Sequence, residues 1–84
     1  MVNINPKTYN LSPRTKLKKG PEGIFIIIER KSRIIMKDGY KILSNVKKIE
    51  EFEPGKKISV LSSAPVCSKT KHFLHENGVS IENV

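Results

Sequence analysis

The chain has 84 residues, of which 16 are lysine or arginine and 8 are aspartate or glutamate, giving a formal charge of +8. This length predicts one small domain, and a hydrophobic content of 37% in clear runs argues against a disordered chain. The longest apolar run, 23–28, is too short to span a bilayer, no signal peptide is recognisable, and a single cysteine excludes an internal disulfide, so we expect a cytoplasmic protein without membrane contact.

Basic charge is concentrated in the N-terminal half of the chain. Residues 1–37 hold nine basic and two acidic side chains, whereas residues 38–84 hold seven and six. Such a patch attracts polyanions, so we expect nucleic acid or an acidic protein as the partner. The alternative is a solvated basic surface that reflects a lysine-rich proteome. A chain this short buries a thin core, and a homodimer would add buried area.

Residues 1–22 are predicted to form an extended basic arm, and residues 23–84 a single α/β domain. The arm contains three prolines and the basic cluster KLKKG at 16–20, with little hydrophobic periodicity. Proline removes a backbone donor and favours extended conformations in the residue before it. We therefore expect extended, partly ordered structure here, with a few apolar side chains holding the arm against the core.

The segment 23–36 is predicted to contain two strands. Phe25 to Ile28 is β-branched and aromatic on both faces, which is typical of a strand buried on both sides of a sheet. The polar residues 29–32 predict a turn, and 34–36 a second short strand. The two form a hairpin with a four-residue loop, or one long strand with a bulge.

An amphipathic helix is predicted over 39–53, with Asp38 as its N-terminal cap and Pro54-Gly55 ending it. A strand over 57–61, a turn, a second helix that Gly78 ends and a last strand over 79–81 follow. The element order is β-β-α-β-α-β. This order predicts an α/β fold, with a small mixed four-stranded sheet and two helices, in which right-handed crossovers connect parallel strands.

The loop after the strand 57–61 is a candidate anion-binding site, because ligands bind at the carboxyl ends of strands in open α/β sheets. Free amides at the start of the second helix would lower the pKa of a cysteine there and attract anions. The candidate residues are Ser62, Ser63, Cys67 and Lys69. The alternative is a structural cysteine that behaves as a small hydrophobic side chain.

The segment KISVLSSAPVCSKTKHFLHENGVSIENV resembles the first β-α-β unit of thioredoxin-like proteins, in particular glutaredoxins and arsenate reductases. The matching positions are Cys67, Lys71, Phe73-Leu74, Gly78-Val79 and Glu82. The resemblance covers 57–84 and implies that Cys67 is an attacking thiol. Because Thr70 stands at the position of the second cysteine, it implies a monothiol mechanism.

Two further short patterns could indicate a metal site, and each has a simpler explanation. His72 and His75 are neighbours on the second helix, but no second cluster of ligands completes a zinc site, so we expect exposed histidines and no metal. Glu29-x-Lys31 follows an apolar strand and resembles the Glu-x-Lys element of restriction-endonuclease-like nucleases. The upstream acidic residue of that pattern is missing, and the alternative is a solvated loop.

Backbone contact with nucleic acid is the main functional prediction. The residues proposed for it are Lys16, Lys18, Lys19, Arg30, Lys31 and Arg33. Exposed aromatic side chains for base stacking are scarce, so phosphate contact is favoured over sequence-specific readout. We therefore expect a small non-enzymatic binding or accessory module without a cofactor. The alternative is a monothiol redox or anion-binding protein in which Cys67 is the catalytic residue.

Overall fold

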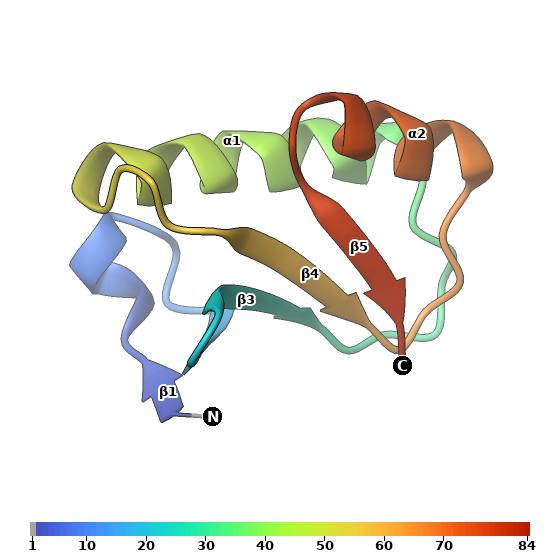
Figure 1. Ribbon diagram of the computed structural model, residues 1–84. Helices are drawn as coiled ribbons and strands as arrows, with labels where there is room; N and C mark the ends of the chain where they lie inside the picture. The colour runs from blue at the N-terminus through green and yellow to red at the C-terminus, as the bar shows by residue number, and fades with distance from the viewer. Residues whose placement is uncertain (1) are drawn as a thin grey trace.

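The computed structural model describes residues 2–84, so Met1, the first residue of the predicted arm, lies outside the described residues. Figure 1 shows a sheet with both helices on the same side of it. The elements in chain order are β1 (Val2–Ile4), η1 (Pro6–Tyr9), β2 (Lys16–Gly20), β3 (Gly23–Ile28), α1 (Met36–Phe52), β4 (Ile58–Ser62), α2 (Ser68–Glu76) and β5 (Ser80–Asn83). The predicted small α/β fold with two helices is confirmed.

The sheet has five strands in the order β1-β2-β3-β4-β5, so the predicted count of four is wrong. The first three strands form an antiparallel meander, and β3, β4 and β5 are parallel. Helix α1 connects β3 to β4, and helix α2 connects β4 to β5. These are the crossovers that the alternation of strands and helices predicted.

The extra strands come from the predicted arm. Strand β2 contains the cluster KLKKG, and it pairs with both β1 and β3. A single apolar residue, Leu17, is enough to fix its orientation, since it is 2% exposed in the core. Between β1 and β2, the short helix η1 begins after Asn5, whose Oδ1 accepts a hydrogen bond from the amide of Lys7 at 3.0 Å.

The predicted second strand of a hairpin at 34–36 is wrong. Ile34 is completely buried and forms an isolated parallel bridge with Val66, while Met36 already begins α1. Asp38 does cap the helix, but from within its first turn: its Oδ2 accepts a hydrogen bond from the amide of Ile35 at 2.9 Å. The hairpin partner of β3 is β2, which precedes it.

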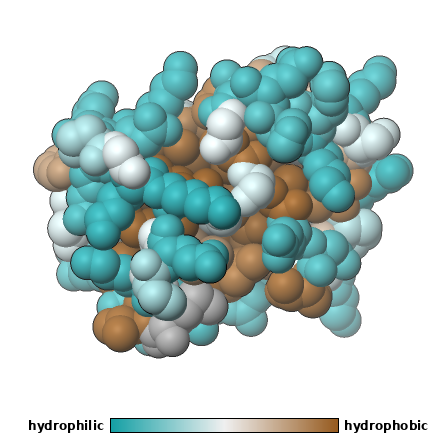
Figure 2. Space-filling view, viewed as in Figure 1, coloured by the Kyte–Doolittle hydropathy of each residue, from teal (hydrophilic) through white to brown (hydrophobic). Residues whose placement is uncertain are grey.

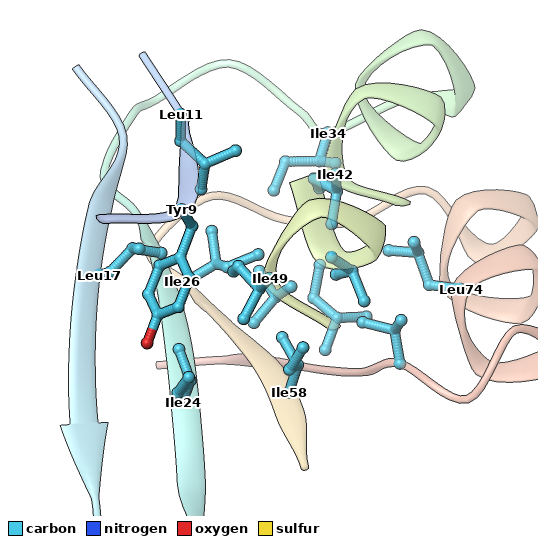
Figure 3. Packing of buried hydrophobic residues seen from close by; sticks show 14 of the residues in the cluster. Tyr9, Leu11, Leu17, Ile24, Ile26, Ile34, Ile42, Ile49, Ile58 and Leu74 are labelled. Carbon is cyan, nitrogen blue, oxygen red and sulfur yellow. The ribbon is translucent and has the colours of Figure 1, made fainter. Parts of the chain in front are cut away.

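The hydrophobic core lies between the sheet and the two helices. Figure 3 shows side chains from the strands and from α1 and α2 meeting there, with Tyr9 and Leu11 joining from the N-terminal segment. Ile49 and Leu74, from the two helices, are fully buried. In the space-filling view, hydrophilic side chains surround hydrophobic ones in the middle of the face shown (Figure 2). No helix within residues 2–84 has the length and apolar character needed to cross a membrane.

Candidate functional site

An open cleft of about 520 Å³ lies beside the carboxyl end of β3. Its apolar lining comes from β3 and α1, and charged side chains come from β2 and the segment before it, from the loop after β3 and from α1. The lining residues are Ser12, Arg14, Thr15, Lys16, Ile26, Ile27, Ile28, Glu29, Arg30, Asp38, Lys41, Ile42 and Asn45. The cleft therefore has an apolar wall with four cations and two carboxylates around it.

The ion pair between Arg30 and Asp38 organises one side of the cleft. The guanidinium binds both carboxylate oxygens and also donates to the carbonyl oxygens of Ser32 at 3.2 Å and Arg33 at 3.1 Å. The hydrogen bond from Arg30 holds the pKa of Asp38 below its usual range, and the amide of Ile35 and the charge of Lys41 act in the same direction. Arg30 thus fixes the loop between β3 and α1 to the start of α1.

A second ion pair crosses from β2 to the end of β3. Lys16 Nζ lies 2.9 Å from Glu29 Oε1, and both side chains are exposed. The hydrogen bond from Lys16, with its charge, lowers the pKa of Glu29. Because the pair is in solvent, it neutralises charge locally and contributes little to stability.

Arg14 and Lys41 are the cations of the cleft that remain available. Neither forms an ion pair with a carboxylate within residues 2–84, whereas Lys16 and Arg30 do. Helix geometry explains how Lys41 enters the site, since Asp38, Lys41 and Asn45 lie three and four residues apart on one face of α1. A phosphate in the cleft would meet two cations without competing with an internal carboxylate.

The six residues predicted to contact a polyanion are not all brought together. Lys16 and Arg30 line the cleft, whereas Lys31 and Arg33 lie in the exposed loop after β3. The alternation of strand β2 places Lys18 on the same face as Lys16, and Lys19 on the opposite one. Arg14 and Lys41 were not predicted from the sequence. For Lys41, its spacing from Asp38 and Asn45 on one face of a helix was a usable signal.

The predicted anion-binding loop is built mainly from internal hydrogen bonds. Ser62 is fully buried, and its Oγ donates to the carbonyl oxygen of Ala64 at 2.9 Å. The Oγ of Ser63 accepts a hydrogen bond from the amide of Arg30 at 3.1 Å. The Ser62 hydroxyl therefore holds the turn of the loop, the Ser63 hydroxyl connects the loop to Arg30, and Lys69 is exposed.

Cys67 lies at the N-terminus of α2, directly before its first residue, and its side chain is partly exposed. The backbone amides of Thr70 and then Lys69 lower the pKa of the thiol, and the charge of Arg33 acts in the same direction. These amides belong to the first turn of α2, and their hydrogen bonds to the sulfur stabilise the negative charge of the thiolate. This environment favours the thiolate.

The Glu29-x-Lys31 pattern does not fit a metal centre. Glu29 is paired with Lys16, and the nearby Asp38 is held by Arg30. Within the described part of the chain, no three side chains of the metal-ligating types lie close enough to hold an ion. The exposed His72 pairs with Glu76 on the same helix at 2.8 Å.

Comparison with known proteins gives a fold and no family. No family model matches the sequence, and no curated protein matches it. A crystal structure of a repair endonuclease from Pyrococcus abyssi is similar, with a TM-score of 0.66 and 13% identity. The match covers 82% of this chain and 31% of that one, so this chain spans about a third of the neighbour's length. At this identity the similarity shows a shared fold.

Proposed function

We propose that this chain is a non-enzymatic binding module whose cleft beside β3 holds the phosphate backbone of a nucleic acid. The observation that carries the proposal is the charge arrangement: Arg14 and Lys41 are unpaired within residues 2–84, beside two ion pairs that neutralise the carboxylates. Cations that are already free do not lose an internal partner when they bind phosphate. The net charge of +8 would favour the approach of any polyanion.

The fold comparison gives independent, weaker support. A protein described as a repair endonuclease contains the same fold over 82% of this chain. That fold is therefore compatible with a protein that works on nucleic acid. The carboxylates of the cleft are engaged with Lys16 and Arg30, which favours binding over metal-assisted cleavage for the present chain.

Salt dependence of binding is the first test. Each neutralised phosphate contributes a slope of about 0.9 in log affinity against log salt for duplex DNA, so two to four contacts give a slope of about 2 to 4. Fluorescence anisotropy with a labelled duplex and a labelled single strand, at low and at physiological ionic strength, measures this slope. Absence of binding at low ionic strength would refute the proposal.

A double variant locates the contact. Arg14→Ala with Lys41→Ala should weaken binding about tenfold or more and lower the salt slope by about 2. The matched control is Lys47→Ala with Lys48→Ala, which removes the same charge from exposed positions of α1 outside the cleft. Equal losses in the two double variants would show that net charge, not the cleft, attracts the ligand.

The same assay separates nucleic acid from an acidic protein. Unlabelled polyglutamate is the competitor, since it carries carboxylates in place of phosphates. Displacement of the oligonucleotide at equal concentrations of charge would favour an acidic protein as the partner. We expect polyglutamate to compete more weakly, because a guanidinium such as that of Arg14 binds phosphate through two parallel hydrogen bonds.

A second candidate function uses Cys67 as a monothiol or as part of an anion site, in line with the resemblance to thioredoxin-like proteins. Its support is the lowered pKa of the thiol at the start of α2. The rate of alkylation by iodoacetamide against pH should have its midpoint below that of free cysteine. A midpoint at or above the free value, or no reaction in the folded chain, would exclude this function.

A further inference from the structure

The sheet has one covered face and one open face. Both helices lie on the same side of it, and no helix within residues 2–84 covers the other side (Figure 1). Strands β3, β4 and β5 are parallel, and parallel sheets almost always have both faces covered. The open face therefore lacks a layer that its strand type normally has.

The alternation of the strands defines which residues form this open face. The residues of β2 to β5 that point to the helices are in the buried core, namely Leu17, Ile24, Ile26, Ile58, Val60 and Ile81. The residues between them point the other way and are aligned by the strand register in two rows. The first row is Lys16, Ile27, Leu61 and Glu82, and the second is Lys18, Phe25, Ser59 and Ser80.

Across β2 to β5 the open face is apolar in the middle and oppositely charged on its two sides, with β1 lying beyond β2. Phe25, Ile27 and Leu61 are half-buried, and none of them belongs to the core cluster or packs against it. Lys16 lies at the β2 edge of the first row, and Glu82 at the β5 edge. A partner for this face needs an apolar middle with the opposite order of charges.

We propose that a second copy of this chain covers the open face, around a two-fold axis that runs parallel to the strands and passes between β3 and β4. This operation reverses the order of the strands, so the first row of one copy packs against the first row of the other copy in the opposite order. Lys16, which pairs with Glu29 in its own chain, then also faces the second copy's Glu82, and Ile27 faces the second copy's Leu61. The contact is isologous, and each charge pair forms twice.

The second row fits the same axis. Phe25 faces the second copy's Ser59, so a large side chain is placed over a small one. Ser59 is already satisfied by the hydroxyl of Ser80, with the two Oγ atoms 2.9 Å apart. The two sheets would pack with their strands nearly aligned, which is a common arrangement of stacked sheets.

Charge excludes the other two-fold arrangement of the same faces. An axis across the strands would place β2 over β2, and Lys16 and Lys18 would face lysines of the second copy. The axis parallel to the strands replaces this repulsion with attraction. Four strands at about 4.8 Å spacing and about 15 Å of length give a footprint of roughly 300 Å² per copy, so the dimer is weak and reversible.

The test is sedimentation equilibrium of the full chain, without nucleic acid, from about 10 µM to about 1 mM. The wild-type chain should associate reversibly to a dimer in this range. Lys16→Glu places glutamate opposite Glu82, and Glu82→Lys places lysine opposite Lys16, so each variant alone should dimerise at least about tenfold more weakly. An equimolar mixture of the two should dimerise again, because both charge pairs are then complementary.

Three results would overturn the proposal. They are a wild-type chain that stays monomeric at about 1 mM, single variants that associate as well as the wild type, and a mixture that does not associate. A monomer would indicate that a different protein or a further segment covers the face. Both substitutions are at exposed positions, and circular dichroism of each variant checks that it folds. This proposal does not depend on nucleic-acid binding, and because Lys16 and Ile27 also line the cleft, dimerisation is measured without nucleic acid.

Discussion

Gly23 is the position where the structure makes its sharpest prediction about stability. This residue begins β3, has a φ of 151°, and lies against the segment that leads into β4. A Cβ built on it would overlap the carbonyl oxygen of Lys57 and lie 3.0 Å from the carbonyl carbon. The same oxygen accepts a hydrogen bond from the amide of Ile24 at 2.9 Å, so it cannot move without loosening the start of the β3–β4 pair.

The expected cost of Gly23→Ala follows from two contributions. The backbone conformation costs a residue with a side chain about 1–3 kcal/mol, and forcing a methyl group into a packed site costs about 1–3 kcal/mol more. Together they lower the free energy of unfolding by about 2–6 kcal/mol. A domain of this length has a total stability of about 4–13 kcal/mol, so the variant should be close to unfolding.

Gly55→Ala is the matched control, because Gly55 also has a positive φ, 85°, but has no atom within 4 Å of a built Cβ. Its cost should be about 0–1 kcal/mol, since the conformational penalty is partly offset by the reduced entropy of the unfolded chain. Urea denaturation followed by circular dichroism measures both. With a slope near 1 kcal/mol per M, Gly23→Ala should lower the midpoint by about 2 M or more. Similar midpoints for the two variants would refute the role assigned to the Lys57 carbonyl.

Three further predictions concern the helix start, the N-terminal segment and the core. Asp38→Asn should lower the free energy of unfolding by about 1–3 kcal/mol near pH 7. Because Arg30 lowers the pKa of Asp38, this difference should be present above the ordinary pKa of aspartate and disappear as the pH falls through the lowered value. Urea denaturation curves of the two proteins that stay equally far apart in acid would contradict this prediction. Tyr9→Phe removes a 2.6 Å hydrogen bond to Glu53 and should cost about 1 kcal/mol. Burial, together with that hydrogen bond, raises the pKa of Tyr9 to about 12. The extra stability of the wild type over Tyr9→Phe should therefore be present below the ordinary pKa of tyrosine and be lost as the pH rises through about 12. A tyrosinate absorbance titration that is the same in the variant as in the wild type would contradict this prediction. Leu74→Ala empties a fully buried site and should cost about 2–5 kcal/mol in the same urea assay, and a loss below about 1 kcal/mol would show a more adaptable core.

Local patterns in the sequence predicted the elements that follow β3. The stripe of apolar residues predicted α1, the segment KISVL predicted β4, and Gly78 predicted the end of α2. These features depend on the periodicity of side chains within one element, so they can be recognised without knowledge of any partner. The assignment of Asp38 as the cap was also close, because capping involves atoms only a few residues apart.

Strand pairing could not be obtained in the same way. The segment 16–20 has one apolar residue among lysines, and it becomes β2 because β1 and β3 lie on either side of it and exchange backbone hydrogen bonds with it. The segment 34–36 has the composition of a strand, but Ile34 forms only an isolated bridge with Val66, and Met36 is already the first residue of α1. Hydrogen bonds between strands depend on a partner distant in the chain, which a local pattern does not contain.

For the candidate binding surfaces, too, some features follow from the sequence and others depend on the tertiary structure. The sequence by itself determined the excess of basic charge, its concentration in the first 37 residues and the position of Cys67 at the start of a helix. Only the tertiary structure decided that Lys16 and Arg30 are paired. It also decided that, among residues 2–84, Arg14 and Lys41 have no carboxylate partner and one face of the sheet carries no helix. The reason is physical: the energy of a charge or an apolar side chain depends on its neighbours in space, and folding alone determines these neighbours.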